Sequence, residues 1–177
     1  MKTLIVIDMQ KDFIDGSLGT PEAVAILPKV QAKIFAYREN GNEIIFTRDT
    51  HGSDYMETSE GKHLPVVHCV KGTEGWMIPA ELDIPDCEHI DKPSFGWTKW
   101  ASVLENGADT PRKPFEAIEM IGVCTDICVV SNALVLKALY PEVPITVDAS
   151  CCAGVTPEKH RAALEILRSC QVEVIGA

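Results

Sequence analysis

The sequence predicts an α/β protein in which helices cover both faces of an open, mostly parallel sheet, a three-layer α/β/α arrangement. Strand-like runs recur at wide intervals along the 177 residues, and several are nearly continuous apolar runs. Such runs are typical of parallel strands that are buried on both faces. Helix-like segments lie between them, and this alternation favours parallel strands joined by crossover helices. Because no repeat, low-complexity tract or linker interrupts the chain, we expect one domain over residues 1–177.

Six segments are expected to form strands, namely residues 2–9, 42–49, 88–93, 115–123, 144–150 and 171–177. Four helices are expected at residues 21–40, 98–107, 125–140 and 156–170. The last helix has a clear start, because Thr156 can cap it, Pro157 takes the first helical position and Glu158 lies in the first turn. Within the first helix, Pro28 is a candidate kink.

The segment from His51 to about Pro85 departs from this alternation. It is rich in glycine, proline and charged residues and has little regular periodicity. A connection of this length inside a compact domain is usually a functional loop. We therefore expect it to contribute to a binding or catalytic site.

The charge of the chain excludes several classes of partner. The sequence has 26 acidic and 16 basic residues, a formal net charge of −10. Such a surface repels phosphate backbones and anionic membranes, so neither nucleic acid nor a membrane is an expected partner. The first apolar run is too short for a signal peptide, and no stretch approaches the ~18 apolar residues of a membrane span. These features predict a cytoplasmic protein.

Seven cysteines occur, at positions 69, 87, 124, 128, 151, 152 and 170. Their odd number and the lack of a secretion signal predict reduced thiols. Neither Cys124 with Cys128 nor the adjacent pair Cys151 and Cys152 has the C-x-x-C spacing of zinc ribbons or thioredoxin-like redox sites. Most are expected to be small core residues, and the sequence assigns no role to Cys151 and Cys152.

Residues that could carry chemistry follow four of the expected strands. Ligands of open parallel α/β sheets bind beyond the carboxyl ends of the strands. Those ends carry Asp8, then Asp49 with His51, then Lys92, and finally the segment from Cys124 to Cys128. The fold thus predicts that two carboxylates, an imidazole, an ammonium and a thiol meet at one edge of the sheet.

The two cysteines of the last segment differ in position. Cys128 is expected near the third residue of a helix that Thr125 or Asp126 can cap. There, unpaired backbone N–H groups and the positive end of the helix dipole favour a thiolate. Cys124 precedes that helix, so its backbone matters more than its sulfur. Position alone leaves open a buried core role for both.

Asp8 and Lys92 could complete a catalytic arrangement around such a thiol. A nearby lysine keeps an aspartate ionised and favours the thiolate, while the aspartate accepts the thiol proton and later delivers it to a leaving amine. The alternative is that Asp8 is a structural polar residue at a strand end and Lys92 is a solvated charge.

The segment RDTH suggests a metal site. Asp49 and His51 are two residues apart, so both side chains point the same way in an extended chain. With His68 or His63 from the following loop, they would form a two-histidine, one-carboxylate site with open positions. The alternative is that these histidines are ordinary hydrogen-bonding residues, and the spacing does not choose between the two.

Five motifs together resemble those of the isochorismatase-like cysteine hydrolases, and within them the nicotinamidases. They are IDMQKDF at 7–13, TRDTH at 47–51, VVHCVKGTEG at 66–75, DKPSFGW at 91–97 and GVCTDICV at 122–129. They occur in order over nearly the whole chain. The first and last are quite specific for the superfamily, and the D-x-H and H-C-V-x-G-T elements favour the nicotinamidase branch.

The resemblance implies a six-stranded parallel sheet and a catalytic triad of Asp8, Lys92 and Cys128. It also implies a cis peptide bond between Val123 and Cys124. In such a turn, the backbone N–H groups of Cys124 and Cys128 would be directed at the oxyanion of a tetrahedral intermediate.

The resemblance further implies that Asp49, His51 and His68 hold one divalent metal ion, with zinc as the first candidate and iron or manganese as alternatives. In nicotinamidases this ion is thought to hold the pyridine nitrogen of the substrate. Phe13 and Trp97 would then pack against the pyridine ring.

Two departures from the nicotinamidase pattern lie near the expected pocket. Thr50 precedes the metal histidine and Gly52 follows it, where tryptophan and proline are common. Gly96 and Trp97 stand where alanine and phenylalanine are common. Because both differences flank the pocket, they bear on the substrate more than on the reaction.

The function expected on this basis is the hydrolysis of nicotinamide to nicotinate and ammonia through a thioester on Cys128. One alternative is an isochorismatase-family hydrolase of another small amide or an N-carbamoyl compound. A second, from a different class, is a non-catalytic thiol- or metal-binding module. Relatives of this kind often associate, so a homodimer or homotetramer is expected.

Overall fold

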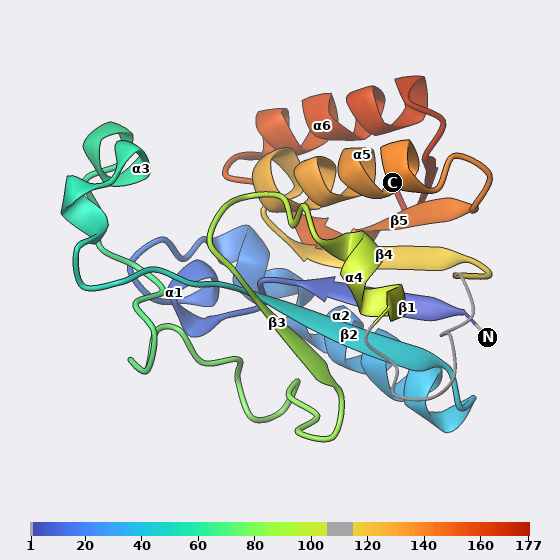
Figure 1. Ribbon diagram of the computed structural model, residues 1–177, viewed down its shortest axis with the longest axis horizontal. Coiled ribbons are helices and arrows are strands. Elements are labelled where there is room, and N and C mark those ends of the chain that lie inside the picture. Colours follow the sequence, from blue (N-terminus) through green and yellow to red (C-terminus); the bar gives the residue numbers. More distant parts are fainter. Residues whose placement is uncertain (1, 106–114) are drawn as a thin grey trace.

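The computed structural model describes residues 2–105 and 115–177. For residues 103–105 it describes the backbone alone. Within the described residues, six strands form one sheet in the order β3-β2-β1-β4-β5-β6 (Figure 1). The strands are β1 (Thr3–Ile7), β2 (Glu43–Asp49), β3 (Glu88–Lys92), β4 (Ile118–Val123), β5 (Ile145–Ala153) and β6 (Glu173–Ile175). Every neighbouring pair is parallel, which confirms the predicted sheet.

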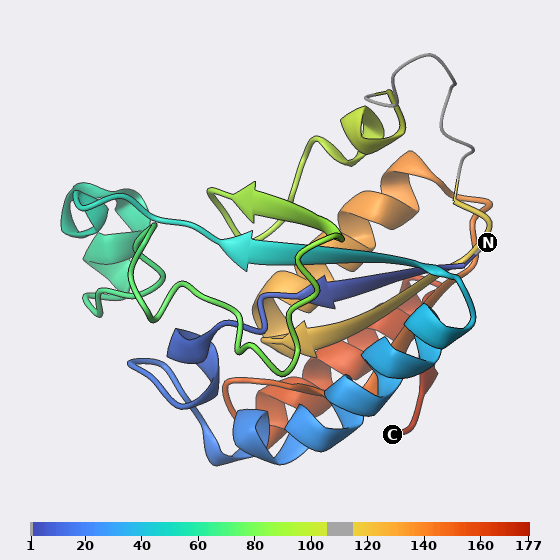
Figure 2. The same ribbon diagram turned by 90° about the horizontal axis from the view of Figure 1, so that it is seen from below.

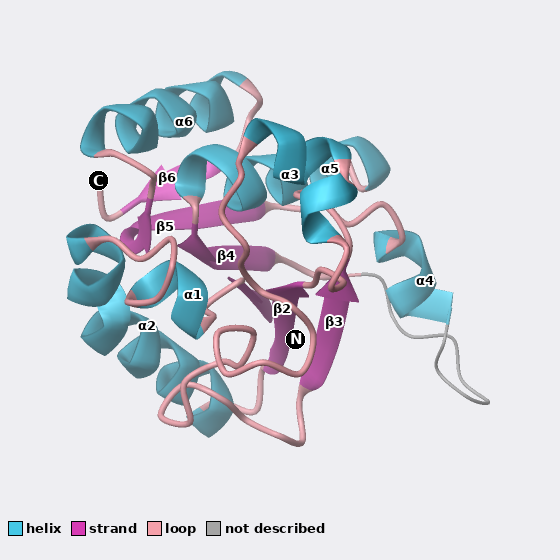
Figure 3. Ribbon diagram, turned by 90° about the vertical axis from the view of Figure 1, so that its left-hand side faces the viewer, coloured by secondary structure: helices cyan, strands magenta, loops and turns pink. Residues whose placement is uncertain are grey.

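Helices cover both faces of this sheet (Figure 3). The long α2 (Pro21–Glu39) and the short α1 (Lys11–Ile14) pack on one face, and α4 (Trp100–Glu105), α5 (Val130–Leu139) and α6 (Pro157–Ser169) belong to the other. Both main apolar clusters therefore lie against the sheet, one on each side. Of the helices described, none has the length and apolar character needed to cross a membrane.

Strand β1 shows why the central strands read as continuous apolar runs. All five of its residues are buried. Leu4 and Val6 belong to the cluster beneath α2, whereas Ile5 and Ile7 belong to the cluster beneath α5 and α6. Burying each such side chain contributes about 1.5–3 kcal/mol. With both faces covered, four of the five residues are apolar, and the first, Thr3, is polar but donates its hydroxyl to Glu43 at 2.8 Å.

Strand β5 is longer than expected and contains an irregularity. It runs to Ala153, and its register against β4 shifts between Met120 and Gly122. Beyond this shift, the adjacent Cys151 and Cys152 belong to opposite clusters, one beneath α2 and one beneath α5 and α6. Both thiols are buried, so their role is to pack on the two faces of the sheet.

The two long helices begin as their sequences predict. Thr20 accepts a hydrogen bond from the N–H of Ala23 at the start of α2, and Thr156 caps α6 in the same way. The helix α2 continues through Pro28 without a break. The expected helix 98–107 is observed as α4, and its last two residues lie outside the described part of the chain.

The long segment after β2 is only partly irregular. It contains a 3₁₀ turn at Tyr55–Glu57, the five-residue helix α3 (Ser59–His63) and a single parallel bridge between His51 and Val70. In Figures 1 and 2 the strands point towards α1 and α3, which lie beyond the carboxyl ends of the sheet. This segment is therefore placed where the sequence predicts the site.

Candidate active site

Chemically active side chains gather at the carboxyl edge of the sheet. Asp8 follows β1, Asp49 ends β2, Lys92 ends β3 and Cys124 follows β4. From the central pair β1 and β4, the sheet extends through β2 on one side and β5 on the other. Such a change of direction is the place where ligands bind in open α/β sheets.

Asp8, Lys92 and Cys128 meet in the interior. Asp8 Oδ2 lies 2.6 Å from Lys92 Nζ, and Lys92 Nζ lies 3.5 Å from Cys128 Sγ. Asp8 and Lys92 are 0% exposed and Cys128 is 4% exposed. The Thr47 hydroxyl donates to Asp8 Oδ1 at 2.6 Å, and Lys92 also donates to the carbonyl of Ser94 at 3.1 Å. The predicted convergence of these three side chains is confirmed.

Burial decides the protonation state of this group. Burial raises the pKa of the Cys128 thiol well above its usual value, and the charge of Asp8 raises it further against the opposing Lys92 ammonium. Burial also raises the pKa of Asp8, an effect that Lys92 opposes. For Lys92, burial disfavours the charge, but Asp8, Cys128 and Asp49 outweigh it and raise the pKa. Burial and the Asp8 charge therefore favour the thiol form of Cys128, whereas the Lys92 ammonium favours the thiolate.

The segment after β4 forms a single π-helical turn, Thr125–Val129, which leads into α5. Neither expected residue caps this turn. The Thr125 hydroxyl is hydrogen bonded to His160 Nδ1 at 2.8 Å, and Asp126 Oδ1 accepts from the N–H of Val155 at 2.9 Å. Both side chains are thus committed to the start of α6. They fix the position of the turn instead of satisfying its N–H groups.

The approach to this turn requires a glycine. Gly122 has a φ of 121°, and a Cβ there would lie 2.1 Å from the carbonyl oxygen of Ile7. Only glycine therefore lets β4 pass β1 at this point. The following Val123–Cys124 peptide bond is cis, as the resemblance implied. Within the described residues, no backbone acceptor is found for the N–H of Cys124.

A second group of ligand-type side chains lies beside the first. Asp49, His51, Glu60 and His68 each offer one atom within 4.8 Å of all the others. Asp49 Oδ2 lies 3.0 Å from His51 Nε2 and 3.6 Å from His68 Nε2. Glu60 Oε1 lies 3.7 Å from both of these nitrogens. Of the two loop histidines considered, His68 therefore joins the group, whereas His63 is exposed and bonds a carbonyl of its own helix.

Glu60 is the member of this group that the sequence did not reveal. It lies in α3, away from any strand end, and no D-x-H type of spacing marks it. Thr58 caps this short helix by accepting from the N–H of Gly61. The only local signal is this cap, and it predicts a helix start, not a ligand.

The four groups are chemically suited to a divalent cation. Burial opposes ionisation of Asp49, but hydrogen bonds from His51 and His68 and the charge of Lys92 hold its pKa well below the usual range. Burial and the Asp49 charge raise the pKa of Glu60. Two carboxylates and two imidazoles thus converge, and a cation among them would relieve the repulsion that raises the pKa of Glu60. Mixed nitrogen and oxygen ligands of this kind suit zinc and other transition metals.

Side chains of the first motif bond to the backbone of the segments that carry these ligands and so orient them. Gln10 accepts from the N–H of Asp49 at 2.7 Å and donates to its carbonyl at 2.9 Å. Asp12 accepts from the N–H of Cys69 at 2.8 Å, next to His68. The other ring nitrogen of His68 faces a backbone carbonyl two residues earlier at 2.8 Å, which leaves Nε2 for the group.

A cavity of about 260 Å³ opens over both groups. Its lining includes Phe13, Asp49, Glu60, His68, Phe95, Cys124 and Cys128. The Phe13 ring lies 5.5 Å from the His68 ring, as a residue packing beside a ligand there would. Trp97 is not among the lining residues: its backbone N–H donates to Asn132, and its ring packs on the cluster beneath α5. The structure therefore does not place Trp97 at this cavity, and Phe95 lies there.

Comparisons with known proteins agree with this geometry. A family model described as an isochorismatase domain matches residues 2–177. The chain is 27% identical to a nicotinamidase/pyrazinamidase of Mycobacterium tuberculosis over 99% of this chain and 98% of the relative. It is similar to the structure of a Pyrococcus horikoshii pyrazinamidase in complex with zinc, with 29% identity, 99% of both chains covered and a TM-score of 0.80. A Streptococcus mutans pyrazinamidase/nicotinamidase gives a TM-score of 0.82 at 27% identity, with 99% and 100% of the two chains covered.

Proposed function

The chain belongs to the isochorismatase family and is a hydrolase, and we propose that its reaction is the conversion of nicotinamide to nicotinate and ammonia through a thioester on Cys128. The observation that carries this proposal is the cavity itself. Its lining includes Cys128, whose thiol lies against the buried Lys92 and Asp8, and it includes Asp49, Glu60 and His68 from the group of two histidines and two carboxylates. A volume of about 260 Å³ suits a small molecule instead of a polymer.

The first chemical step is a proton transfer within the buried group. Burial raises the pKa of the Cys128 thiol, and Asp8 takes the thiol proton as the sulfur attacks the amide carbon. The raised pKa of Asp8 makes it a stronger base than an exposed carboxylate. Lys92 stays charged beside both and stabilises the thiolate as it forms.

The second step expels ammonia. Attack converts the amide carbon to a tetrahedral centre whose oxyanion accepts from the N–H groups of Cys124 and Cys128. Asp8 returns its proton to the leaving nitrogen, the C–N bond breaks, and the acyl group stays on sulfur. Water, deprotonated by Asp8, then attacks the thioester, and the products are the carboxylic acid and the regenerated thiol.

We propose that one divalent ion, zinc in the first instance, is held by Asp49, His51, Glu60 and His68. When bound, it would hold the pyridine nitrogen and so orient the substrate. Phe13 would pack along the ring from the side of His68. Iron and manganese share enough of this ligand preference to be the alternatives.

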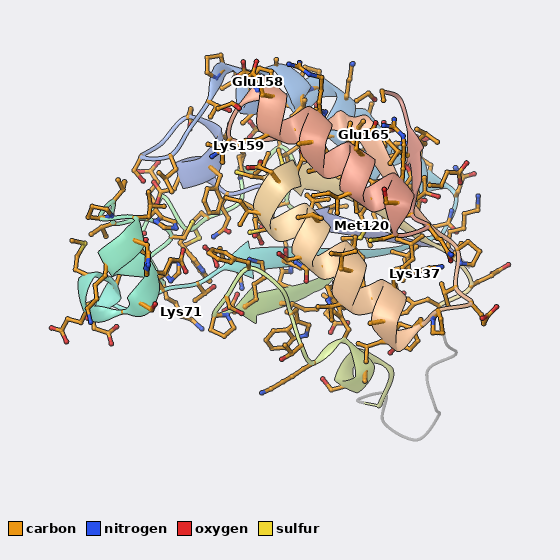
Figure 4. All side chains as sticks on the ribbon, turned by 90° about the horizontal axis from the view of Figure 1, so that it is seen from above. Lys71, Met120, Lys137, Glu158, Lys159 and Glu165 are labelled. Carbon is orange, nitrogen blue, oxygen red and sulfur yellow. The ribbon has the colours of Figure 1, made fainter. Side chains whose placement is uncertain are left out.

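One observation favours a second candidate substrate class. Lys159, at the start of α6, lines the same cavity and is exposed (Figure 4). Nicotinamide has no charge for this ammonium to bind, whereas an N-carbamoyl amino acid carries a carboxylate. The second candidate is therefore hydrolysis of an N-carbamoyl compound by the same three catalytic residues. Lys159→Ala would weaken turnover of carboxylated substrates and leave that of nicotinamide unchanged.

The experiment that tests the proposal is an ammonia-release assay over nicotinamide, pyrazinamide and N-carbamoyl compounds, with and without a chelator. Cys128→Ala is expected to abolish release, and Cys124→Ser to retain substantial activity because only its backbone is used. Turnover of nicotinamide that persists after metal removal would argue against a role of the ion in holding the substrate, whereas release from N-carbamoyl compounds and not from nicotinamide would argue for that class. A stoichiometric reaction with thiol reagents, without turnover of any amide, would favour a non-catalytic module.

A further inference from the structure

Asn132 is a fully buried polar residue in α5, four positions after Cys128. Its side-chain Nδ2 donates to the carbonyl of Cys128 at 2.8 Å and to the carbonyl of Phe95 at 2.9 Å. Its Oδ1 accepts from the backbone N–H of Trp97 at 2.8 Å and from the indole N–H of Trp100 at 3.0 Å. All four hydrogen bonds that an asparagine side chain can form are made.

The orientation of this amide is determined by its partners. Two of them are carbonyls and two are N–H donors, so exchanging Nδ2 and Oδ1 would break all four bonds. A buried amide costs free energy unless it is satisfied, and an apolar residue would fill a helix–sheet interface without that requirement. The position therefore serves a need that packing alone does not explain.

The four bonds connect the two halves of the candidate active site. One bond holds the π-helical turn at Cys128, two hold the loop that follows β3, and the fourth holds Trp100 at the start of α4, directly after that loop. That loop contains Ser94, whose carbonyl accepts from Lys92, and Phe95, which lines the cavity. The segments carrying the thiol and the ammonium are thus joined through one side chain.

We propose that Asn132 is a positioning residue, which sets the distance between Cys128 and the segment of Lys92 and fixes the cavity wall at Phe95. Its catalytic consequence rests on the proposed function, since it acts through Cys128 and Lys92 and does not touch substrate. Its effect on the thiol and on the loop does not depend on which substrate is used.

Two replacements distinguish the bond of Asn132 to the turn at Cys128 from its bonds to the segment after β3. Asn132→Ala removes all four bonds. Asn132→Thr keeps a hydroxyl that can bond the carbonyl four residues earlier in a helix, which here is that of Cys128, but it loses the bonds to the loop. As a matched control, Leu136→Ala removes a fully buried side chain one turn later in α5 and contacts neither segment through hydrogen bonds.

With Asn132→Ala, kcat for ammonia release is expected to fall about 100-fold, the cost of a displacement near 1 Å at a reacting group. Asn132→Thr is expected to raise KM, because the wall at Phe95 loosens, while kcat stays within about threefold of the wild type because the turn is still held. Leu136→Ala is expected to lower thermal stability and leave both constants unchanged.

Two readouts need no substrate. Alkylation of Cys128 by iodoacetamide, followed by mass spectrometry of its peptide, should change rate in Asn132→Ala and stay close to the wild type in Asn132→Thr. The indole N–H resonance of Trp100 should shift in both variants and not in Leu136→Ala.

If Asn132→Ala and Asn132→Thr match Leu136→Ala in alkylation and in the Trp100 resonance, the positioning role is overturned. If the wild type releases ammonia from no amide while these two readouts change as expected, the proposed function fails and the positioning role stands. Should Asn132→Ala not fold, the comparison of Asn132→Thr with Leu136→Ala decides the same question.

Discussion

Replacing Asp8 by asparagine is expected to change two properties of Cys128 in opposite directions. Ammonia release should fall by about 10²–10⁴-fold, the usual contribution of a positioned base. Alkylation of the thiol should become faster, because the replacement removes a buried negative charge that raises the pKa of Cys128. A replacement that only loosened the fold would expose the thiol without moving the pH dependence of its alkylation.

The size of the second effect follows from the position of Lys92. Its Nζ lies 3.5 Å from Cys128 Sγ. At an effective dielectric constant of about 20, an ammonium and a thiolate at that separation attract by about 5 kcal/mol, which lowers the pKa of the thiol. In the wild type, Asp8 lies 2.6 Å from the same Nζ and cancels much of this attraction.

Asparagine keeps the shape of the Asp8 side chain without its charge, so the attraction of Lys92 would act fully on the sulfur. A thiolate of lower pKa is also a weaker nucleophile, with a Brønsted coefficient near ~0.5. After this correction, alkylation near neutral pH should still be at least about tenfold faster than in the wild type. Because the thiolate fraction grows as pH rises through the thiol pKa, the rise in rate should move to lower pH.

The assay is the rate of iodoacetamide modification of the Cys128 peptide, measured by mass spectrometry across a pH series. Asp148→Asn is the matched control, since it removes a buried carboxylate that belongs to β5 and pairs with Lys33. An Asp8→Asn variant that is folded, inactive and alkylated no faster than the wild type would refute the reasoning. In that case the carboxylate would not control the thiol.

Two further predictions concern Gly122, which precedes the π-helical turn, and Glu60, one of the four ligand-type side chains. Gly122→Ala should lower the free energy of unfolding by about 3 kcal/mol or more, because its Cβ would meet the carbonyl of Ile7 in a strained backbone conformation. Gly72→Ala, also at positive φ but with nothing within 4 Å, should lose only about 1 kcal/mol, and urea denaturation of both variants gives the comparison. Glu60→Gln should weaken zinc binding by at least about tenfold in equilibrium dialysis, whereas His63→Ala should bind as the wild type does. Equal zinc affinity of the Glu60 variant and the wild type would remove Glu60 from the ligand set.

The sheet and the edge of the sheet that carries the site are predictable from the sequence because both depend on periodicity. Continuous burial of β1 follows from its apolar residues, and the parallel order of strands places Asp8, Asp49, Lys92 and Cys124 at the same edge. The order of the strands is therefore the main reason that these side chains lie close together.

What the sequence does not predict depends on individual side-chain partners. Thr125 and Asp126 have the composition of helix caps, but their bonds to the start of α6 are visible only once two distant helices are packed. Trp97 has the size of a pocket wall, yet one hydrogen bond to Asn132 turns its segment towards the core. Which of two acceptable hydrogen-bond partners a side chain takes depends on the tertiary structure, and the local sequence pattern does not determine it.

The charges of the site indicate that the triad and the metal group form one electrostatic unit. Lys92 lies 2.6 Å from Asp8 and 3.4 Å from Asp49 Oδ1, so one ammonium serves a carboxylate of each group. Asp8, Asp49 and Glu60 together bring three carboxylates to this single buried cation. Unpaired charge is costly where it is buried, so a second cation would favour the ionised form of all three carboxylates. A divalent ion between Asp49 and Glu60 would supply it and leave more of the Lys92 charge for Asp8 and the sulfur of Cys128. The metal group would then tune the thiol through Lys92 as well as hold a ligand.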